Sequence, residues 1–237
     1  MKRTGLIITA SALVVFLLAC LVPASAANSY WQRMAQGFPN SVVVYEHLYE
    51  YEGPGLTIAA KIPQLAGALD AGWQEEFNQR MREQLAEYVS WLKDIAAEAL
   101  EIEDNGYRPQ PYVGFLDFEV KLNQGGLLSI AAVNYVYTGG AHGMTYYQYI
   151  NIDLTNGRSI GFGDIFDTDA EIERAAAAIA EQIWEQRDLF FESTFSADQF
   201  QEDQGFYLTE NHAVICFGLY ELAPYSSGIP EFAISAP

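Results

Sequence analysis

Apolar side chains recur at steps of four and three residues along a long stretch in the first half of the chain. This spacing places them on one face of a single long helix, and charged residues fill the other face. Such a helix must bury its apolar stripe against another element, so it needs a sheet or a second helix beside it. We predict a helix over residues 70–100 with the stripe Leu69, Trp73, Phe77, Met81, Leu85, Tyr88, Leu92 and Ile95.

Strand patterns precede and follow this helix. Runs of β-branched and aromatic residues bounded by Gly, Asn and Pro predict short strands joined by tight turns. We expect strands over residues 42–51, 56–62, 112–122, 127–138, 144–154, 205–209, 213–218 and 231–234. Pro63 is expected to end the second strand, because proline cannot donate to a strand ladder. In the third strand, Tyr112, Leu116, Phe118, Val120 and Leu122 are expected to share one buried face.

A second helix is predicted to begin after Thr168, because its hydroxyl and the carboxylate of Glu171 form a capping box. The order of strands and helices predicts an α+β fold of two closely packed halves, each an antiparallel sheet with a helix across one face. We expect a signal peptide over residues 1–26, a first domain over 27–150 and a second domain over 151–237.

The N-terminus has the anatomy of an export signal. Lys2 and Arg3 precede an apolar run that ends in small residues, and Ala24 and Ala26 fit a signal-peptidase site. We therefore expect an exported chain, periplasmic, envelope-associated or secreted, that begins near Ala27. Two alternatives stay open: lipidation at Cys20, which lies in a lipoprotein-like box, and retention of the apolar run as a membrane anchor.

Charge narrows the class of partner. Loss of the signal leaves 10 basic and 31 acidic residues, a net charge of −21. Such a charge disfavours nucleic acids and anionic membrane surfaces and favours basic proteins, although it also serves simple solubility. Cys216 is then the single remaining cysteine, so the fold has no internal disulfide. Its apolar neighbours indicate a buried, unreactive thiol.

Few residues suggest catalysis. His142 lies between glycines, and His47 and His212 belong to other segments with no ligand spacing, so we predict no metal, no cofactor and no catalytic set. A structural histidine at a glycine turn is the simplest interpretation, and contact with a partner is the next. The aspartates at 164, 167 and 169 suit helix N-termini better than a calcium loop.

Tyrosines gather around the glycine turn, where Tyr135, Tyr137, Tyr146, Tyr147 and Tyr149 flank it. The odd-numbered ones point the same way within each strand. They indicate either rings packed across strands or an amphipathic recognition surface, since tyrosine is common in binding anchors.

Several motifs occur together in an order that resembles a known family. They are Ala60 to Leu65, Tyr137 to Gly143, Asn151 to Arg158, Asp164 to Phe166, Phe206 to Leu208 and Tyr220 to Gly228. This set is similar to the exported tandem-domain region of RsiV-type anti-sigma factors and to the non-catalytic N-terminal part of PdaC-type peptidoglycan deacetylases. The resemblance implies two α+β domains and, in the RsiV branch, binding of lysozyme, a basic protein. We expect this chain to be the sensing or binding module alone.

The function we expect is a non-catalytic extracytoplasmic binding or sensing module for a lysozyme-like basic protein or a cell-wall glycan. The alternatives are a cell-wall hydrolase or deacetylase that uses His142, and a structural envelope protein. The candidate contact residues are Tyr135, Tyr137, Gly139, Gly140, His142, Tyr147 and Tyr149, with a second group of Tyr220, Glu221 and Tyr225.

Overall fold

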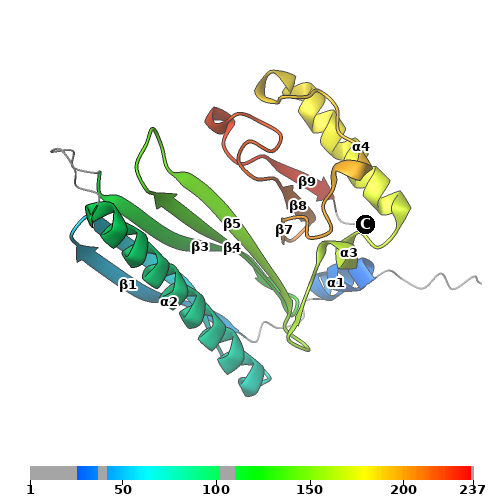
Figure 1. Cartoon of the computed structure of the whole chain (residues 1–237). Helices are drawn as coiled ribbons and strands as arrows, with labels where there is room; N and C mark the ends of the chain where they lie inside the picture. The colour runs from blue at the N-terminus through cyan, green and yellow to red at the C-terminus, as the bar shows by residue number, and fades with distance from the viewer. Residues whose placement is uncertain (1–25, 37–41, 102–109, 236–237) are drawn as a thin grey trace, which may run out of the picture.

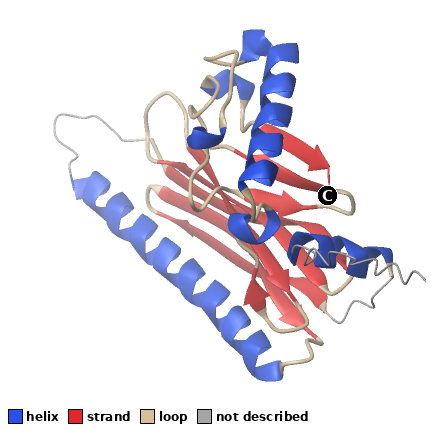
Figure 2. Ribbon diagram, turned by 90° about the vertical axis from the view of Figure 1, so that its right-hand side faces the viewer, coloured by secondary structure: helices blue, strands red, loops and turns tan. Residues whose placement is uncertain are grey.

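The computed structural model describes residues 26–36, 42–101 and 110–235. The expected export signal, apart from its last residue, and the alternative lipidation site Cys20 lie outside the described residues. The described part begins with the helix α1 (Ala26–Ala35), so the expected cleavage site before Ala27 falls at the start of this helix. The expected α+β fold is confirmed. A six-stranded sheet and a three-stranded sheet each carry a helix, and the two sheets lie between those helices (Figures 1 and 2).

The larger sheet has the strand order β1-β2-β3-β4-β5-β6. Its strands are β1 Val43–Gly53, β2 Leu56–Ala66, β3 Tyr112–Gln124, β4 Leu127–Tyr137, β5 Met144–Asp153 and β6 Arg158–Ser159. One detail differs from the sequence expectation, because β2 and β3 are parallel while every other pair is antiparallel. The long helix α2 (Ala71–Glu101) supplies the crossover that a parallel pair needs.

The helix α2 packs along one face of this sheet, as its periodicity predicts. Its buried residues are Phe77, Asn78, Met81, Leu85, Val89, Leu92 and Ala96. Each large apolar side chain buried here is worth about 1.5–3 kcal/mol relative to exposure. The prediction that Leu69 belongs to the stripe is wrong, because Leu69 lies before the helix begins and is 79% exposed.

Two strand details also differ from expectation. β2 continues through Pro63, which pairs with Glu46 of β1 but lies beyond Ala60, where the pairing with β3 ends. A missing N–H is tolerated where one edge of a strand is unpaired. In β3 the register shifts between Val120 and Leu122, so Leu122 turns to the opposite face and joins the core of the second half.

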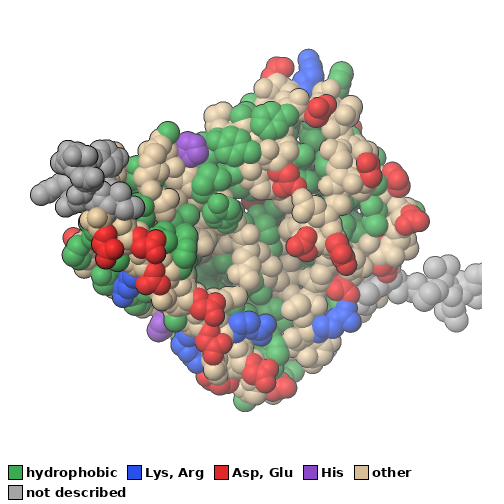
Figure 3. Space-filling model, viewed as in Figure 1, with side chains coloured by type: hydrophobic (Ala, Val, Ile, Leu, Met, Phe, Trp, Pro, Cys, Tyr) green, Lys and Arg blue, Asp and Glu red, His purple; other side chains and the backbone are tan. Residues whose placement is uncertain are grey.

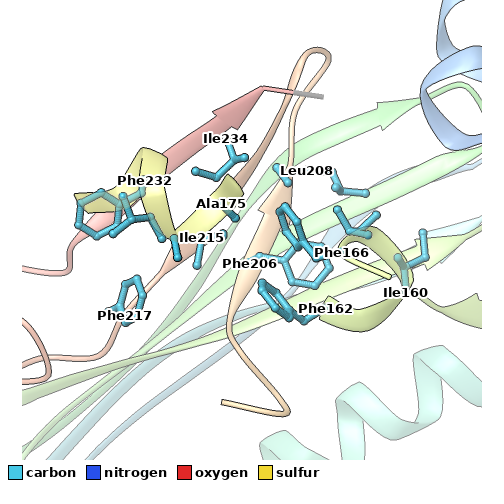
Figure 4. Packing of buried hydrophobic residues seen from close by; sticks show 14 of the residues in the cluster. Ile160, Phe162, Phe166, Ala175, Phe206, Leu208, Ile215, Phe217, Phe232 and Ile234 are labelled. Carbon is cyan, nitrogen blue, oxygen red and sulfur yellow. The ribbon is translucent and has the colours of Figure 1, made fainter. Parts of the chain in front are cut away.

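The second half contains α3 (Phe162–Ile165), α4 (Asp169–Glu185) and the sheet β7-β8-β9, whose strands are Phe206–Leu208, His212–Cys216 and Glu231–Ser235. Three 3₁₀ turns, Arg187–Leu189, Ala197–Gln199 and Tyr225–Ser227, complete it. α4 begins as predicted, because the Thr168 hydroxyl accepts from the Glu171 N–H at 3.2 Å, and the Glu171 carboxylate accepts from the Asp167 N–H. Figure 4 shows the apolar side chains that pack between α3, α4 and this sheet.

The two halves are joined by buried hydrogen bonds. β7 is an edge strand, and two of its outward backbone groups meet side chains of the larger sheet. The Ser129 hydroxyl accepts from the Leu208 N–H at 2.9 Å, and the Asn151 amide donates to the Phe206 carbonyl at 2.8 Å. Ser129 also donates to Asn151 at 2.6 Å. Because these groups satisfy one another in the interior, they fix how the two sheets meet.

The helix α1 also packs against the second half. Tyr30 and Met34 are buried in its apolar core, and Arg33 donates to Asp153 at 3.0 Å. The expected domain boundary between residues 150 and 151 falls inside β5 and stays a prediction. No helix in the described ranges is long and apolar enough to cross a membrane.

Candidate binding surface

The glycine turn between β4 and β5 holds His142 at one end of the larger sheet. Gly139 and Gly140 have φ angles of +97° and +93°, a region that favours glycine. Gly143 is needed for a different reason, since a Cβ there would lie 2.4 Å from the ring of Tyr135. The Tyr137 hydroxyl donates to the Gly140 carbonyl at 3.0 Å. These interactions give the turn a defined shape.

His142 meets two tyrosines from the second half. Its Nδ1 lies 2.9 Å from the Gly143 carbonyl, so Nδ1 carries a proton and Nε2 can accept. The Tyr220 hydroxyl lies 3.3 Å from Nε2 and donates to it. The ring of Tyr225 stacks on the imidazole with centroids 4.2 Å apart, and its hydroxyl donates to the Gly143 carbonyl. The structure therefore brings His142 of the first group of candidate contact residues together with Tyr220 and Tyr225 of the second.

These interactions give the surrounding residues clear local roles. Tyr220 is 47% exposed and has a φ of +66°, a strained value for a non-glycine residue. Glu221 accepts from the Gly218 N–H at 2.7 Å and from the Gln201 amide at 3.1 Å, so part of its role is to hold the turn. The partners of His142 are a carbonyl group and two phenols, which is not the arrangement of a general base with its orienting carboxylate.

Tyr147 and Tyr149 lie side by side on β5 with ring centroids 5.8 Å apart. Tyr147 is 41% exposed, whereas Tyr149 is half-buried and stacks on Tyr207 of the smaller sheet. Burial raises the pKa of the Tyr149 hydroxyl, and the neighbouring Cys216 thiol adds to the shift. Tyr147 is thus available to a partner, while Tyr149 belongs mainly to the interface between the sheets.

A groove runs along β5 on the side of the smaller sheet, and we call it the tyrosine groove. It consists of two adjoining hollows of about 320 and 530 Å³ that share Tyr147, Tyr149, Asp203, Gln204 and Gly205. The further lining residues are Met144, Thr145, Tyr146, Gln148, Asn151, Ile160, Gly161, Phe162, Gln201, Glu202, Phe206, Cys216, Phe217, Gly218, Leu219, Glu221 and Ile229. Among all the described lining residues of the two hollows, Glu202, Asp203 and Glu221 are acidic, and none is Lys or Arg.

A second groove runs along β5 on the side of α2, and we call it the helix groove. Its two hollows of about 230 and 350 Å³ share Met81, Gln84 and Gln148. Apolar side chains of α2 and the sheet, including Leu85 and Leu116, contribute to its lining. Figure 1 shows β5 running between α2 and the sheet β7–β9. The lining residues place the helix groove on the α2 side of this strand and the tyrosine groove on the other side. Figure 3 shows a hollow in this region and more acidic than basic side chains on the same face.

Sequence reasoning missed several lining residues. Asp203 and Gln204 come from a connecting segment with no periodic signal. Gln204 is buried, and its amide is satisfied there by donating to the Cys216 carbonyl at 2.7 Å. Tyr146 is 54% exposed; it is one of the tyrosines that flank the turn, but it is not among the candidate contact residues. Cys216 is buried as expected, and burial raises the pKa of its thiol to about 12.

Metal ligation has no candidate cluster in residues 26–36, 42–101 and 110–235, where no three His, Cys, Asp or Glu side chains are grouped to hold an ion. His47 lies on β1 and His212 on β8, in different sheets. The acids near α3 and α4 act as expected at helix starts: Asp164 accepts from the Gly161 N–H at 2.8 Å.

Two family models match the chain in tandem, one for each half. Residues 49–145 match the family described as Deacetylase PdaC, and residues 163–236 match the family described as Protein of unknown function (DUF3298). The chain therefore carries a PdaC-type domain followed by a DUF3298-type domain. This agrees with the family resemblance drawn from its motifs.

A curated relative shares this region. The anti-sigma-V factor RsiV of Bacillus subtilis is 26% identical over 187 residues, which cover 75% of this chain and 62% of RsiV. The matched region thus spans less than two thirds of that relative's length.

Solved structures support the fold. A DUF3298 family protein from Bacteroides fragilis has a TM-score of 0.62 at 18% identity, covering 83% of this chain and 92% of the other. A DUF3298 family protein from Pseudomonas aeruginosa has a TM-score of 0.54 at 19% identity, covering 83% and 91%.

Proposed function

We propose that this chain is an exported, non-catalytic binding module whose partner is a basic protein of the lysozyme type. The observation that carries the proposal is the tyrosine groove, where Asp203 and Glu221 stand beside the exposed ring of Tyr147 and none of the described lining residues is basic. Charged grooves of one sign attract partners of the opposite sign, and exposed tyrosines are frequent anchors. The similarity to RsiV and the expected net charge of −21 support the same partner.

The contact surface in this proposal extends from the groove to the turn that holds His142. Tyr220 and Tyr147 are its exposed rings, while Tyr135, Tyr149 and Tyr225 support them from half-buried positions. Aromatic rings held by neighbours lose little conformational entropy on binding, which favours affinity.

A matched pair of charge reversals tests the groove. Asp203 is exposed and lines the groove, whereas Glu87 lies on the exposed face of α2. Asp203→Lys is expected to weaken lysozyme binding about fivefold, the effect of about 1 kcal/mol at one rim charge. Glu87→Lys changes the net charge equally and is expected to have a smaller effect. Equal effects of the two reversals in calorimetric titrations would overturn the assignment of the groove.

A cell-wall glycan is the second candidate partner. The exposed rings of Tyr146 and Tyr147 beside the amides of Gln148 and Gln201 favour it, because rings and amides together offer apolar faces and hydrogen bonds. Titration with soluble peptidoglycan fragments tests this candidate, and a loss of their binding in Tyr147→Ala is the expected result.

A further inference from the structure

The strand β5 has an unpaired outer edge beside both grooves. β6 pairs only with Ile152 and Asp153 of β5, so among the described strands none covers the edge from residue 144 to 150. The Asn151 carbonyl accepts from the Ile160 N–H at 2.8 Å, on the outer side. Backbone groups two residues apart point the same way in a strand, so those of Thr145, Tyr147 and Tyr149 also point outward.

The side chains of β5 alternate between the two faces of the sheet. Tyr149 stacks on Tyr207 of the smaller sheet and Tyr147 stacks on Tyr149, whereas Gln148 lies between them in sequence and lines the helix groove with Met81 and Leu85. Because β5 is an edge strand between the grooves, Tyr147 and Gln148 each contribute to the lining of both. A strand added beside β5 has the same alternation, so its successive side chains enter opposite grooves. An unpaired edge with a pocket on each face is the arrangement that proteins use to bind an extended peptide by strand addition.

We propose that β5 binds an extended segment of its partner as an added strand, with basic side chains in the tyrosine groove and apolar side chains in the helix groove. The assignment of side chains rests on complementarity. The tyrosine groove has acidic residues and no Lys or Arg among its described lining. The helix groove has the apolar side chains Met81, Leu85 and Leu116. Its described charged lining residues are Lys61, Arg80 and Asp117, so it carries no net negative charge that would attract a basic side chain. This proposal deepens the proposed function and rests on it, because the added strand is taken to come from the basic partner proposed there.

The length of the segment follows from the edge. Three outward-facing residues, Thr145, Tyr147 and Tyr149, span about 13 Å at about 3.3 Å per residue. An added strand of about five residues covers them at the same rise per residue. A self-pairing of two β5 edges is disfavoured, because it brings two acidic tyrosine grooves together.

The test uses the expected mature chain, residues 27–237, and a seven-residue peptide of alternating lysine and valine with blocked ends. On binding, amide hydrogen exchange at residues 145, 147 and 149 is expected to slow at least tenfold, with little change at residues 146 and 148, which already face β4. A peptide with the same sequence and N-methyl groups on its β5-facing amides keeps the charge but loses the donors. We expect it to bind at least tenfold more weakly. A peptide with glutamate in place of lysine is expected not to bind.

Two variants of the chain separate backbone from side chain. Tyr147→Pro removes one backbone N–H that points outward and therefore makes no hydrogen bond to β4. Tyr147→Ala removes the ring but keeps that N–H. Peptide affinity is expected to fall further in the proline variant, once its melting temperature shows that it is folded. Equal binding of the methylated and unmethylated peptides by the unaltered chain overturns strand addition, and so does no peptide binding.

Lysozyme titrated in parallel distinguishes this proposal from the proposed function. If saturating peptide leaves the affinity for lysozyme unchanged, the lysozyme-type partner is retained, but β5 is rejected as the site where it binds. Binding of the peptide without binding of lysozyme retains strand addition and rejects the lysozyme-type partner.

Discussion

The buried bridge between the two sheets gives the most demanding prediction about this fold. Ser129 is fully buried, donates to Asn151 at 2.6 Å and accepts from the Leu208 N–H at 2.9 Å. Ser129→Ala removes one oxygen and leaves two polar groups without their partner. Leu208 is itself fully buried, so water cannot replace the hydrogen bond to its N–H without a change in packing.

The size of the effect follows from those two groups. A buried donor or acceptor left unsatisfied costs about 1–3 kcal/mol. Ser129→Ala leaves the Leu208 N–H without an acceptor and the Asn151 side-chain oxygen without this donor, so the two costs together set a lower limit of about 2 kcal/mol. Because losses above about 4 kcal/mol from one substitution are exceptional, the free energy of unfolding is expected to fall by about 2–4 kcal/mol. For a chain of this size, 1 kcal/mol corresponds to about 2–4 °C in melting temperature, so the midpoint is expected to fall by about 5–15 °C.

Urea unfolding and calorimetry on the variant measure both quantities, with Ser90→Ala on the exposed face of α2 as a matched control. The control is expected to change stability by less than about 0.5 kcal/mol in magnitude, the usual limit for exposed positions. If the Ser129→Ala variant is as stable as the control variant, the buried hydrogen bonds of Ser129 do not stabilise the contact between the two sheets. A double-mutant cycle with Asn151→Ala is expected to give a coupling of about 0.5–3 kcal/mol.

Three further predictions concern single positions. Gly143→Ala is expected to destabilise the fold by about 1–3 kcal/mol, because its Cβ meets the Tyr135 ring, whereas Gly163→Ala meets nothing within 4 Å and serves as the control in urea unfolding. The Cys216 thiol, with its pKa raised to about 12, is expected to resist iodoacetamide at pH 8 in the native state and to react in urea, as mass spectrometry reports. Burial opposes ionisation of Asp153, but hydrogen bonds, first from an arginine of α1, lower the pKa of its carboxyl below 3.8. The stability that this shift contributes is fully present above about pH 4 and is lost as pH drops through the lowered pKa of the folded state. Asp153→Asn is therefore expected to reduce the pH dependence of the unfolding free energy below about pH 4, as urea unfolding at several pH values measures.

The sequence predicts the elements of this fold well where one physical signal acts alone. The stripe of α2 from Trp73 onward and the cap at Thr168 are local patterns, and both are confirmed. The errors arise where tertiary pairing decides. Pro63 is compatible with a strand only because β2 and β3 separate beyond Ala60, and Leu122 changes face only because the register of β3 shifts.

The candidate surface is accessible to sequence reasoning in parts. The glycine turn and its tyrosines are local features, so His142 and Tyr147 can be proposed from the chain alone. The packing of His142 against Tyr220 and Tyr225 joins residues far apart in sequence, and no periodic signal links them. Asp203 lies in a connecting segment and becomes part of a groove only when the two sheets meet.

The most direct test of the proposed function is calorimetric titration of residues 27–237 with lysozyme at low and at physiological salt. Saturable binding at micromolar affinity or tighter, weakening as salt rises, is the predicted result, because opposite charges at an exposed groove are screened by ions. No binding at low salt, or binding that salt leaves unchanged, would contradict the account.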